Sequence, residues 1–161
     1  DVASAPGAGA TFTVTLPRAT AAVPTPVSSA PSPSGSEEGV ILLVEDEVQV
    51  RSIARRMLER AGYAVLEARH GADALEVLRR EGTRVAVVVT DVRMPEMDGA
   101  TLAAELAAGY PALPVVFVSG YDRTGLDGER ALPAGATIVE KPFTREALLA
   151  AVRAVRDAAV R

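Results

Sequence analysis

The chain has 161 residues, of which 48% are hydrophobic and 24% charged, with a formal net charge of −4 and no cysteine. This composition indicates a globular protein with one medium domain and an appendage, and it excludes disulfides, thiolate metal sites and a cysteine nucleophile. The mild negative charge argues against direct nucleic-acid binding. We expect no membrane contact by this chain, because no apolar run approaches the length that spans a bilayer.

The first part of the chain shows a short strand pattern followed by a linker composition. Phe12, Val14 and Leu16 alternate with threonines after a Gly/Pro turn, which predicts a strand. One or two strands do not form a domain, so residues 1–18 are interpreted as the end of a larger β structure. Residues 19–38 are rich in Pro, Ser and Ala and are predicted to form a linker. The folded domain is then expected over residues 39–161.

Five candidate strands lie in this domain. Short, continuous apolar runs are typical of strands that are covered on both faces. They occur at 40–44, 85–89, 114–118 and 136–139, and a more polar run at 63–68 predicts an edge strand.

Helical spacing of apolar residues separates these runs. Ile53, Met57, Leu58 and Ala61 form one stripe, Leu75 and Leu78 belong to a second, and Leu148, Val152, Val155 and Ala159 form a third after Thr144, a predicted N-cap. The strands and helices alternate, which predicts an α/β fold with a doubly wound, parallel, five-stranded sheet. Gly125 and Gly128 predict a short or irregular helix within 121–132.

Polar residues follow four of the apolar runs. Glu45 and Asp46 follow the first, Asp91 the third, Ser119 the fourth, and Lys141, the only lysine of the chain, the fifth. In an open parallel sheet the carboxyl ends of the strands share one edge, where ligands bind. We therefore expect three carboxylates, a hydroxyl and an ammonium group to meet there.

This set of groups suits phosphate chemistry. Three neighbouring carboxylates repel one another unless a cation joins them, and oxygen ligands without cysteine favour Mg²⁺. A metal ion, an ammonium group and a hydroxyl donor together form a receptor for a phosphoryl group. The central carboxylate, Asp91, would then be the nucleophile that forms an aspartyl phosphate.

The motifs that carry these residues resemble a known family. "VEDE" at 44–47, "TDVRMPEMDG" at 90–99, "SG" at 119–120 and "EKPFT" at 140–144 resemble the receiver domain of two-component response regulators. The resemblance covers residues 39–161 and implies a flavodoxin-like (βα)5 fold with strand order 2-1-3-4-5. It also implies that Asp91 is the phosphoacceptor.

The resemblance implies a role for each of the other site residues. Asp46 and Asp91 would bind Mg²⁺ directly, Glu45 would bind it through water, and the backbone carbonyl of Arg93 would complete the protein's share. Ser119 would contact a phosphoryl oxygen, and Lys141 would pair with the phosphate. Pro142 would follow a cis peptide bond that directs Lys141 into the site.

The first residues resemble a second family. "SAPGAGATFTVTLP" is similar to the last hairpin of a histidine-kinase ATP-binding domain. The order of the segments is then that of a hybrid histidine kinase, and the partner would be the kinase core or a histidine phosphotransfer protein. The chain itself would accept a phosphoryl group and slowly hydrolyse the adduct, whereas kinase activity would belong to the parent protein. We expect a cytoplasmic location, and the sequence leaves a homodimer open.

Some features of the sequence favour other interpretations. Ile138 stands where receivers usually carry an aromatic residue, so the domain could instead be an interaction module that works without phosphorylation. A phosphatase would need an acid two residues after the nucleophile, where this chain has Arg93. "GAGAT" at 7–11 leads into a strand and does not predict a dinucleotide site. His70 precedes a predicted helix and is expected to be a cap or surface residue.

Overall fold

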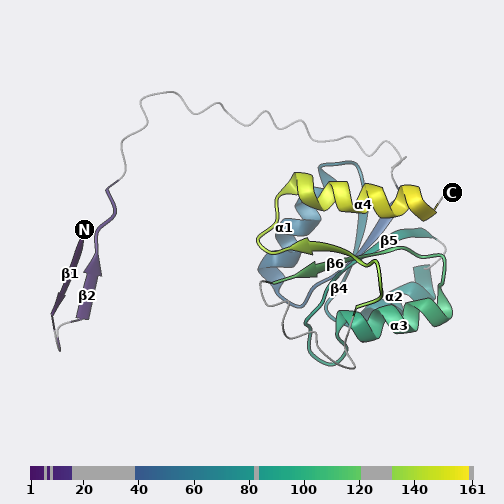
Figure 1. Ribbon diagram of the computed structural model, residues 1–161, viewed down its shortest axis with the longest axis horizontal. Helices are drawn as coiled ribbons and strands as arrows, with labels where there is room; N and C mark the ends of the chain where they lie inside the picture. Colours follow the sequence, from purple (N-terminus) through teal and green to yellow (C-terminus); the bar gives the residue numbers. More distant parts are fainter. Residues whose placement is uncertain (6, 8, 16–38, 82–83, 121–131, 160–161) are drawn as a thin grey trace. The chain divides into compact units, whose positions relative to one another are not determined.

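The structure, a computed structural model, describes residues 1–5, 7, 9–15, 39–81, 84–120 and 132–159. The chain divides into two units, Asp1–Ala30 and Pro31–Arg161. Figure 1 labels the helices and strands of both units. The predicted linker at 19–38 lies outside the described residues, and so does most of the segment in which we expected a short helix, at 121–131.

The first unit contains one antiparallel hairpin. Strand β1 (Val2–Ala5) pairs with β2 (Gly9–Phe12), with Val2 opposite Phe12. The pairing continues beyond the strands, because the Thr13 backbone N–H donates to the Asp1 carbonyl over 2.8 Å. Strand β2 begins at Gly9, before the predicted strand pattern, and ends at Phe12, within it.

The second unit is built on a five-stranded parallel sheet in the order β4-β3-β5-β6-β7. This order corresponds to 2-1-3-4-5 within the domain and confirms the prediction. The more polar strand lies at an edge, also as predicted. The strands are β3 (Val40–Val44), β4 (Ala64–Ala68), β5 (Val85–Asp91), β6 (Val115–Ser119) and β7 (Thr137–Glu140).

Helices cover both faces of the sheet (Figure 1). Successive residues of a strand point to opposite faces, so Ile41 and Leu43 pack with the core under α1 and α4, whereas Leu42 and Val44 pack under α2 and α3. The sheet is therefore buried on both sides, which explains its continuous apolar runs. The helices are α1 (Val48–Glu59), α2 (Gly71–Glu81), α3 (Gly99–Gly109) and α4 (Arg145–Ala159). Among the described helices, none combines the length and apolar character needed to cross a bilayer.

Side chains before three of the helices satisfy free backbone N–H groups. Thr144 Oγ1 accepts from the Ala147 N–H over 3.2 Å, which confirms the predicted N-cap of α4. His70 Nδ1 accepts from the Asp73 N–H over 3.2 Å, which confirms the expected capping role at α2. Asp98 accepts from the Thr101 N–H over 2.8 Å at the start of α3.

One predicted core residue lies on the surface. Ile53 was expected in the buried stripe of α1, but 52% of it is exposed. Ala54 faces the core in its place, four residues before the buried Leu58, which the stripe predicted correctly. Met57 and Ala61 of the predicted stripe are partly buried and pack against the core, so only Ile53 was misplaced.

Candidate functional site

Asp91 lies at the carboxyl end of β5, the central strand of the sheet. It is 9% exposed and follows the fully buried Thr90, whose hydroxyl donates to the Asp91 carbonyl over 2.9 Å. The Arg93 backbone N–H donates to Asp91 Oδ1 over 3.2 Å. These bonds fix the backbone and Oδ1 of Asp91, while Oδ2 contacts Lys141, which follows β7.

Glu45 and Asp46 follow β3, the strand beside β5. Glu45 is 3% exposed, and its backbone N–H donates to the Ala68 carbonyl of β4 over 3.1 Å. Its Oε1 accepts from the Glu47 N–H over 3.3 Å, whereas Asp46 is exposed. One carboxylate oxygen from each of Glu45, Asp46 and Asp91 lies within 4.8 Å of the others. The parallel sheet has brought the three acids together.

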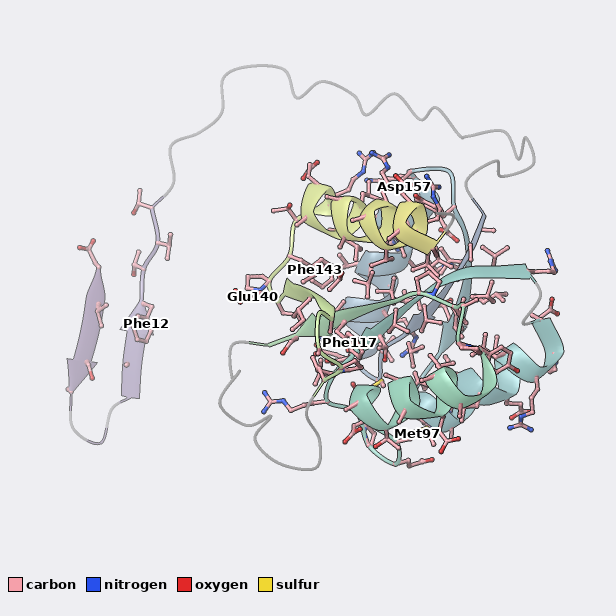
Figure 2. The ribbon with its side chains drawn as sticks, turned by 45° about the vertical axis from the view of Figure 1, so that its right-hand side comes forward. Phe12, Met97, Phe117, Glu140, Phe143 and Asp157 are labelled. Atoms are coloured by element: carbon pink, nitrogen blue, oxygen red, sulfur yellow. The ribbon has the colours of Figure 1, made fainter. Side chains whose placement is uncertain are left out.

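Lys141 joins two of these carboxylates. Its Nζ lies 2.7 Å from Glu45 Oε2 and 2.7 Å from Asp91 Oδ2. The Lys141 backbone N–H donates to the Ser119 carbonyl over 2.7 Å, and its peptide bond to Pro142 is cis, as the resemblance implied. Figure 2 labels Glu140 and Phe143, which flank this segment between β7 and α4. The lone lysine therefore lies inside the acidic cluster.

Ser119 and Arg93 border the cluster. The Ser119 side chain is buried at the end of β6, and its hydroxyl donates to the Gly120 carbonyl over 3.1 Å. Across the strands, Asp91 pairs with Val118, so Ser119 lies one residue beyond the position opposite Asp91. Arg93 reaches Asp91 through its amide, and the predicted use of its carbonyl as a metal ligand stays a prediction.

The environment changes the acidity of two members of the cluster. Burial raises the pKa of the Glu45 carboxyl above its ordinary value; the Lys141 ammonium opposes this increase, and the charge of Asp91 adds to it. For Lys141, burial lowers the pKa, but the hydrogen bonds to Asp91 and Glu45 outweigh it and leave the pKa raised. Lys141 therefore remains charged at neutral pH, and the site holds a fixed positive charge among its acids.

A glycine makes the loop after Asp91 possible. A Cβ on Gly99 would overlap the Asp91 carbonyl oxygen and come within 3.1 Å of the Val92 Cα. The Gly99 N–H donates to the Val92 carbonyl over 3.0 Å, so the loop folds back directly against the backbone that follows Asp91. Met97, labelled in Figure 2, lies in the same loop and packs with the core under α2 and α3.

The donor set fits a small hard cation. Mg²⁺ prefers oxygen ligands and is commonly held by one or two carboxylates together with water and phosphate oxygens. The three acids offer converging oxygens, and among the described carboxylates of the cluster Lys141 Nζ contacts Glu45 Oε2 and Asp91 Oδ2, which leaves Asp46 and Asp91 Oδ1 for other partners. The cluster can therefore hold a divalent ion while Lys141 remains in place.

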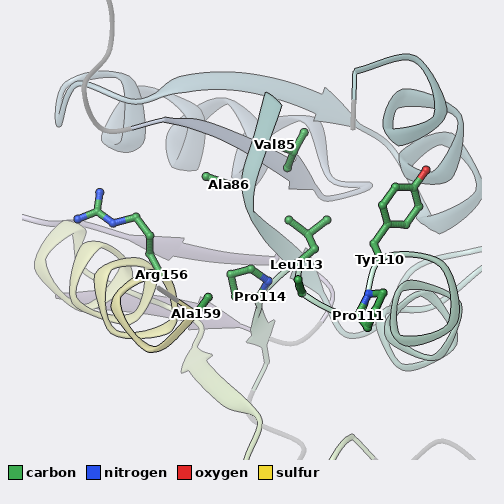
Figure 3. A pocket seen from close by; sticks show the side chains of 9 residues that line it. Val85, Ala86, Tyr110, Pro111, Leu113, Pro114, Arg156 and Ala159 are labelled. Carbon is green, nitrogen blue, oxygen red and sulfur yellow. The ribbon is translucent and has the colours of Figure 1, made fainter. Parts of the chain in front are cut away.

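A hollow at the opposite edge of the sheet offers different chemistry. Figure 3 shows this hollow, of about 420 Å³, beside the amino ends of β5 and β6. Its described lining is mainly apolar and contains no carboxylate; it includes Val85, Tyr110, Leu113, Pro114 and Arg156. This lining offers no ligand set for a divalent cation, so the acidic cluster is the candidate site.

One residue of the site environment was not predicted from the sequence. Arg51, in the first turn of α1, donates from Nη1 to the backbone carbonyls of Glu45 over 2.6 Å and Asp46 over 3.3 Å. The sequence signal was weak, because an arginine near a helix start usually lies on a solvated surface. Only the fold shows that its side chain turns back toward the acidic pair.

Relatives of the chain are two-component signalling proteins. The chain is 41% identical over 159 residues to the sensor kinase CckA of Brucella abortus, an alignment that covers 91% of this chain and 16% of the relative. It is 37% identical over 103 residues to the response regulator receiver protein CpdR of the same organism, covering 64% of this chain and 84% of that protein. The chain thus spans only a small part of the kinase it matches.

Comparison of structures and of family profiles gives the same result. The crystal structure of the receiver domain from the hybrid histidine kinase CckA superposes with a TM-score of 0.60 and 34% sequence identity, covering 73% of this chain and 99% of that one. The profile of the response regulator receiver domain matches residues 41–153, which include all the residues of the acidic cluster and Lys141. The chain therefore belongs to the response regulator receiver domain family.

Proposed function

We propose that this chain accepts a phosphoryl group from a phosphohistidine onto Asp91, with Mg²⁺ held by the acidic cluster. The observation that carries the proposal is the meeting of Glu45, Asp46, Asp91 and Lys141 at one edge of the sheet. Phosphoryl transfer depends mainly on positioning and charge neutralisation, and these are what such a cluster provides.

The balance of charge supports the proposal. A single ammonium does not balance three carboxylates, and burial of Glu45 makes the excess negative charge more costly. Asp46 and Asp91 would bind Mg²⁺ directly, Glu45 through water, and Arg93 through its carbonyl. The ion would supply positive charge where the incoming phosphoryl oxygens lie.

The transfer itself requires only one nucleophile. An Asp91 carboxylate oxygen attacks phosphorus, the new P–O bond forms, and the P–N bond to the donor imidazole breaks. The imidazole leaves with its electron pair and takes up a proton. Lys141, already 2.7 Å from Asp91 Oδ2, pairs with a phosphoryl oxygen, and Ser119 donates its O–H after turning away from the Gly120 carbonyl.

The phosphodonor is proposed to be a histidine kinase core or a histidine phosphotransfer protein. An apolar cleft of about 390 Å³ adjoins the site and is lined by Val50, Ile53, Lys141, Pro142 and Phe143. It offers a contact surface for such a partner directly beside the acceptor. The alignment with a sensor kinase includes most of this chain, which supports placing it within a hybrid kinase whose ATP-binding domain ends in the β1-β2 hairpin. Such a relay would operate in the cytoplasm.

Phosphorylation by a small donor tests the proposal. The chain is incubated with acetyl phosphate and Mg²⁺, and its intact mass is measured by mass spectrometry. We expect the mass of one added phosphoryl group, which is lost when EDTA replaces Mg²⁺ and is absent in Asp91→Asn. A mass gain of equal size in Asp91→Asn would refute the assignment of the acceptor.

A binding measurement separates this function from the interaction-module alternative. Ile138, exposed on β7 in place of the usual aromatic residue, favours that alternative. In a relay, binding of the kinase core or phosphotransfer partner should change on phosphorylation, and Asp91→Asn should abolish that change. Wild type without any mass gain, together with partner binding unaffected by Asp91→Asn, would favour the module.

A further inference from the structure

The side chain of Arg51 connects α1 to the acidic loop after β3. The side chain is 13% exposed, and Nη1 donates to the carbonyls of Glu45 over 2.6 Å and Asp46 over 3.3 Å. Glu45 and Asp46 also supply two of the three carboxylates of the acidic cluster. One guanidinium therefore holds the backbone of both acids.

These two carbonyls lie outside the hydrogen-bond pattern of the helix. The Arg51 backbone N–H donates to the Glu47 carbonyl over 2.9 Å, as in a regular helix. The carbonyls of Glu45 and Asp46 therefore come before the carbonyl that accepts this helical hydrogen bond. Glu47 is the N-cap of α1 but makes no side-chain capping bond. The Arg51 side chain consequently secures the short connection from β3 to α1, through a part-buried bond to the Glu45 carbonyl and an exposed bond to the Asp46 carbonyl.

The guanidinium is itself fixed from the other side. Arg51 Nε lies 3.4 Å from Glu67 Oε1 on the edge strand β4. Arg55, one turn further along α1, has a side chain that is 46% exposed. Its guanidinium donates to Glu59 Oε1 and to Glu67 Oε2, each over 2.7 Å. The planar fork of Arg51 thus bridges β4 and the acidic loop, whereas Arg55 joins only exposed groups.

We propose that Arg51 is a positioning residue that holds the Glu45–Asp46 backbone so that both carboxylates are preorganised for Mg²⁺. This inference rests on the metal site of the proposed function. Arg51 acts through carbonyl oxygens and leaves the carboxylate oxygens available, in contrast to Lys141, which contacts two carboxylates directly. Partners of metal ligands typically contribute about 10–100-fold to metal affinity.

Substitution by lysine separates geometry from charge. Arg51→Lys keeps the positive charge, but one ammonium group cannot reproduce the planar fork that reaches both carbonyls and Glu67. We expect Mg²⁺ to bind the full chain about tenfold more weakly in Arg51→Lys than in wild type, as measured by isothermal titration calorimetry. Arg55→Lys is the matched control, because Arg55 lies on the same helix and also pairs with Glu67. The Mg²⁺ affinity of Arg55→Lys should equal that of wild type.

Two further measurements make the result unambiguous. Amide hydrogen exchange at Asp46 and Glu47 should become faster in Arg51→Lys but not in Arg55→Lys, which reports the loosened loop without metal. If Arg51→Lys is poorly folded, Arg51→Gln replaces it. In Arg51→Gln, loss of the positive charge alone would tighten Mg²⁺ binding, whereas loss of the positioning contacts would weaken it.

The outcomes distinguish this inference from the function on which it rests. Wild-type affinity in Arg51→Lys, an equal loss in Arg55→Lys, or tighter binding in Arg51→Gln would overturn the role of Arg51 and leave the metal site intact. Absence of Mg²⁺ binding in the wild type would overturn the proposed function, and with it the positioning role.

Discussion

The Glu45 side chain is buried in the site although it is ionisable. Its pKa is raised because burial disfavours the carboxylate, and the contact with Lys141 compensates only in part. An ordinary glutamate loses its proton near pH 4.5, so above that value the unfolded chain ionises before the folded one. The folded state then binds more protons, and the free energy of unfolding falls as pH rises through this interval. Lys141 does not contribute here, because its raised pKa lies far above the interval.

This argument predicts the effect of Glu45→Gln on the metal-free protein. The amide removes the titration but keeps an oxygen that can accept from Lys141. We expect wild type to lose stability relative to Glu45→Gln as pH rises from 4.5 to 7, measured by urea unfolding in EDTA. Parallel stability profiles of the two proteins over this range would show that the burial of Glu45 is not costly.

At the scale of single elements, continuous apolar runs predicted the inner strands because these strands are covered on both faces, and the more polar run predicted the edge strand β4. The strand order came from the family resemblance and not from the apolar runs. The end of β5 was less predictable: the strand continues through Thr90 and Asp91, which are polar but buried. Hydrophobicity cannot indicate that such residues belong to a strand. In α1, Ile53 and Ala54 are adjacent and both apolar, so periodicity could not determine which of them faces the core.

The candidate site, like the strands, was only partly predictable from the sequence. The rule that parallel strands share one carboxyl edge predicted that Glu45, Asp46, Asp91 and Lys141 meet. It could not predict the two contacts of Lys141, because they depend on side-chain rotamers. Nor could it predict Arg51, whose role depends on the path of the chain between β3 and α1.

The loop between β5 and α3 leads to a prediction about this element. A Cβ at Gly99 would overlap the Asp91 carbonyl, so Gly99→Ala should displace the loop and cost about 1–3 kcal/mol of stability. Gly109, at the other end of α3, is the matched control, because a Cβ there meets nothing within 4 Å. Gly109→Ala should be neutral or stabilise the protein by about 0.5–1 kcal/mol. Chemical denaturation measures both, and equal stability of the two variants would contradict this account.

For the molecule as a whole, Mg²⁺ should act as a stabilising ligand. A ligand that binds only the folded state adds RT ln(1 + [L]/Kd), or about 2.7 kcal/mol at a concentration of 100 Kd. We expect Mg²⁺ to raise the thermal midpoint of the wild type and to have little effect on Asp46→Asn, as followed by circular dichroism. Glu105→Gln, which removes an exposed acid of α3, is the control and should respond like the wild type. An equal rise in Asp46→Asn would place the bound ion elsewhere.

The direction of the strands has a further consequence for how this domain can be joined to others. The chain enters the sheet at Val40, which pairs with Val85, and α4 ends at Ala159, which lines the same hollow as Val85. Entry and exit therefore lie together, at the edge of the sheet opposite Asp91. A neighbouring domain attached at either point would leave the edge that carries the acidic cluster accessible, so the fold is compatible with more than one domain order.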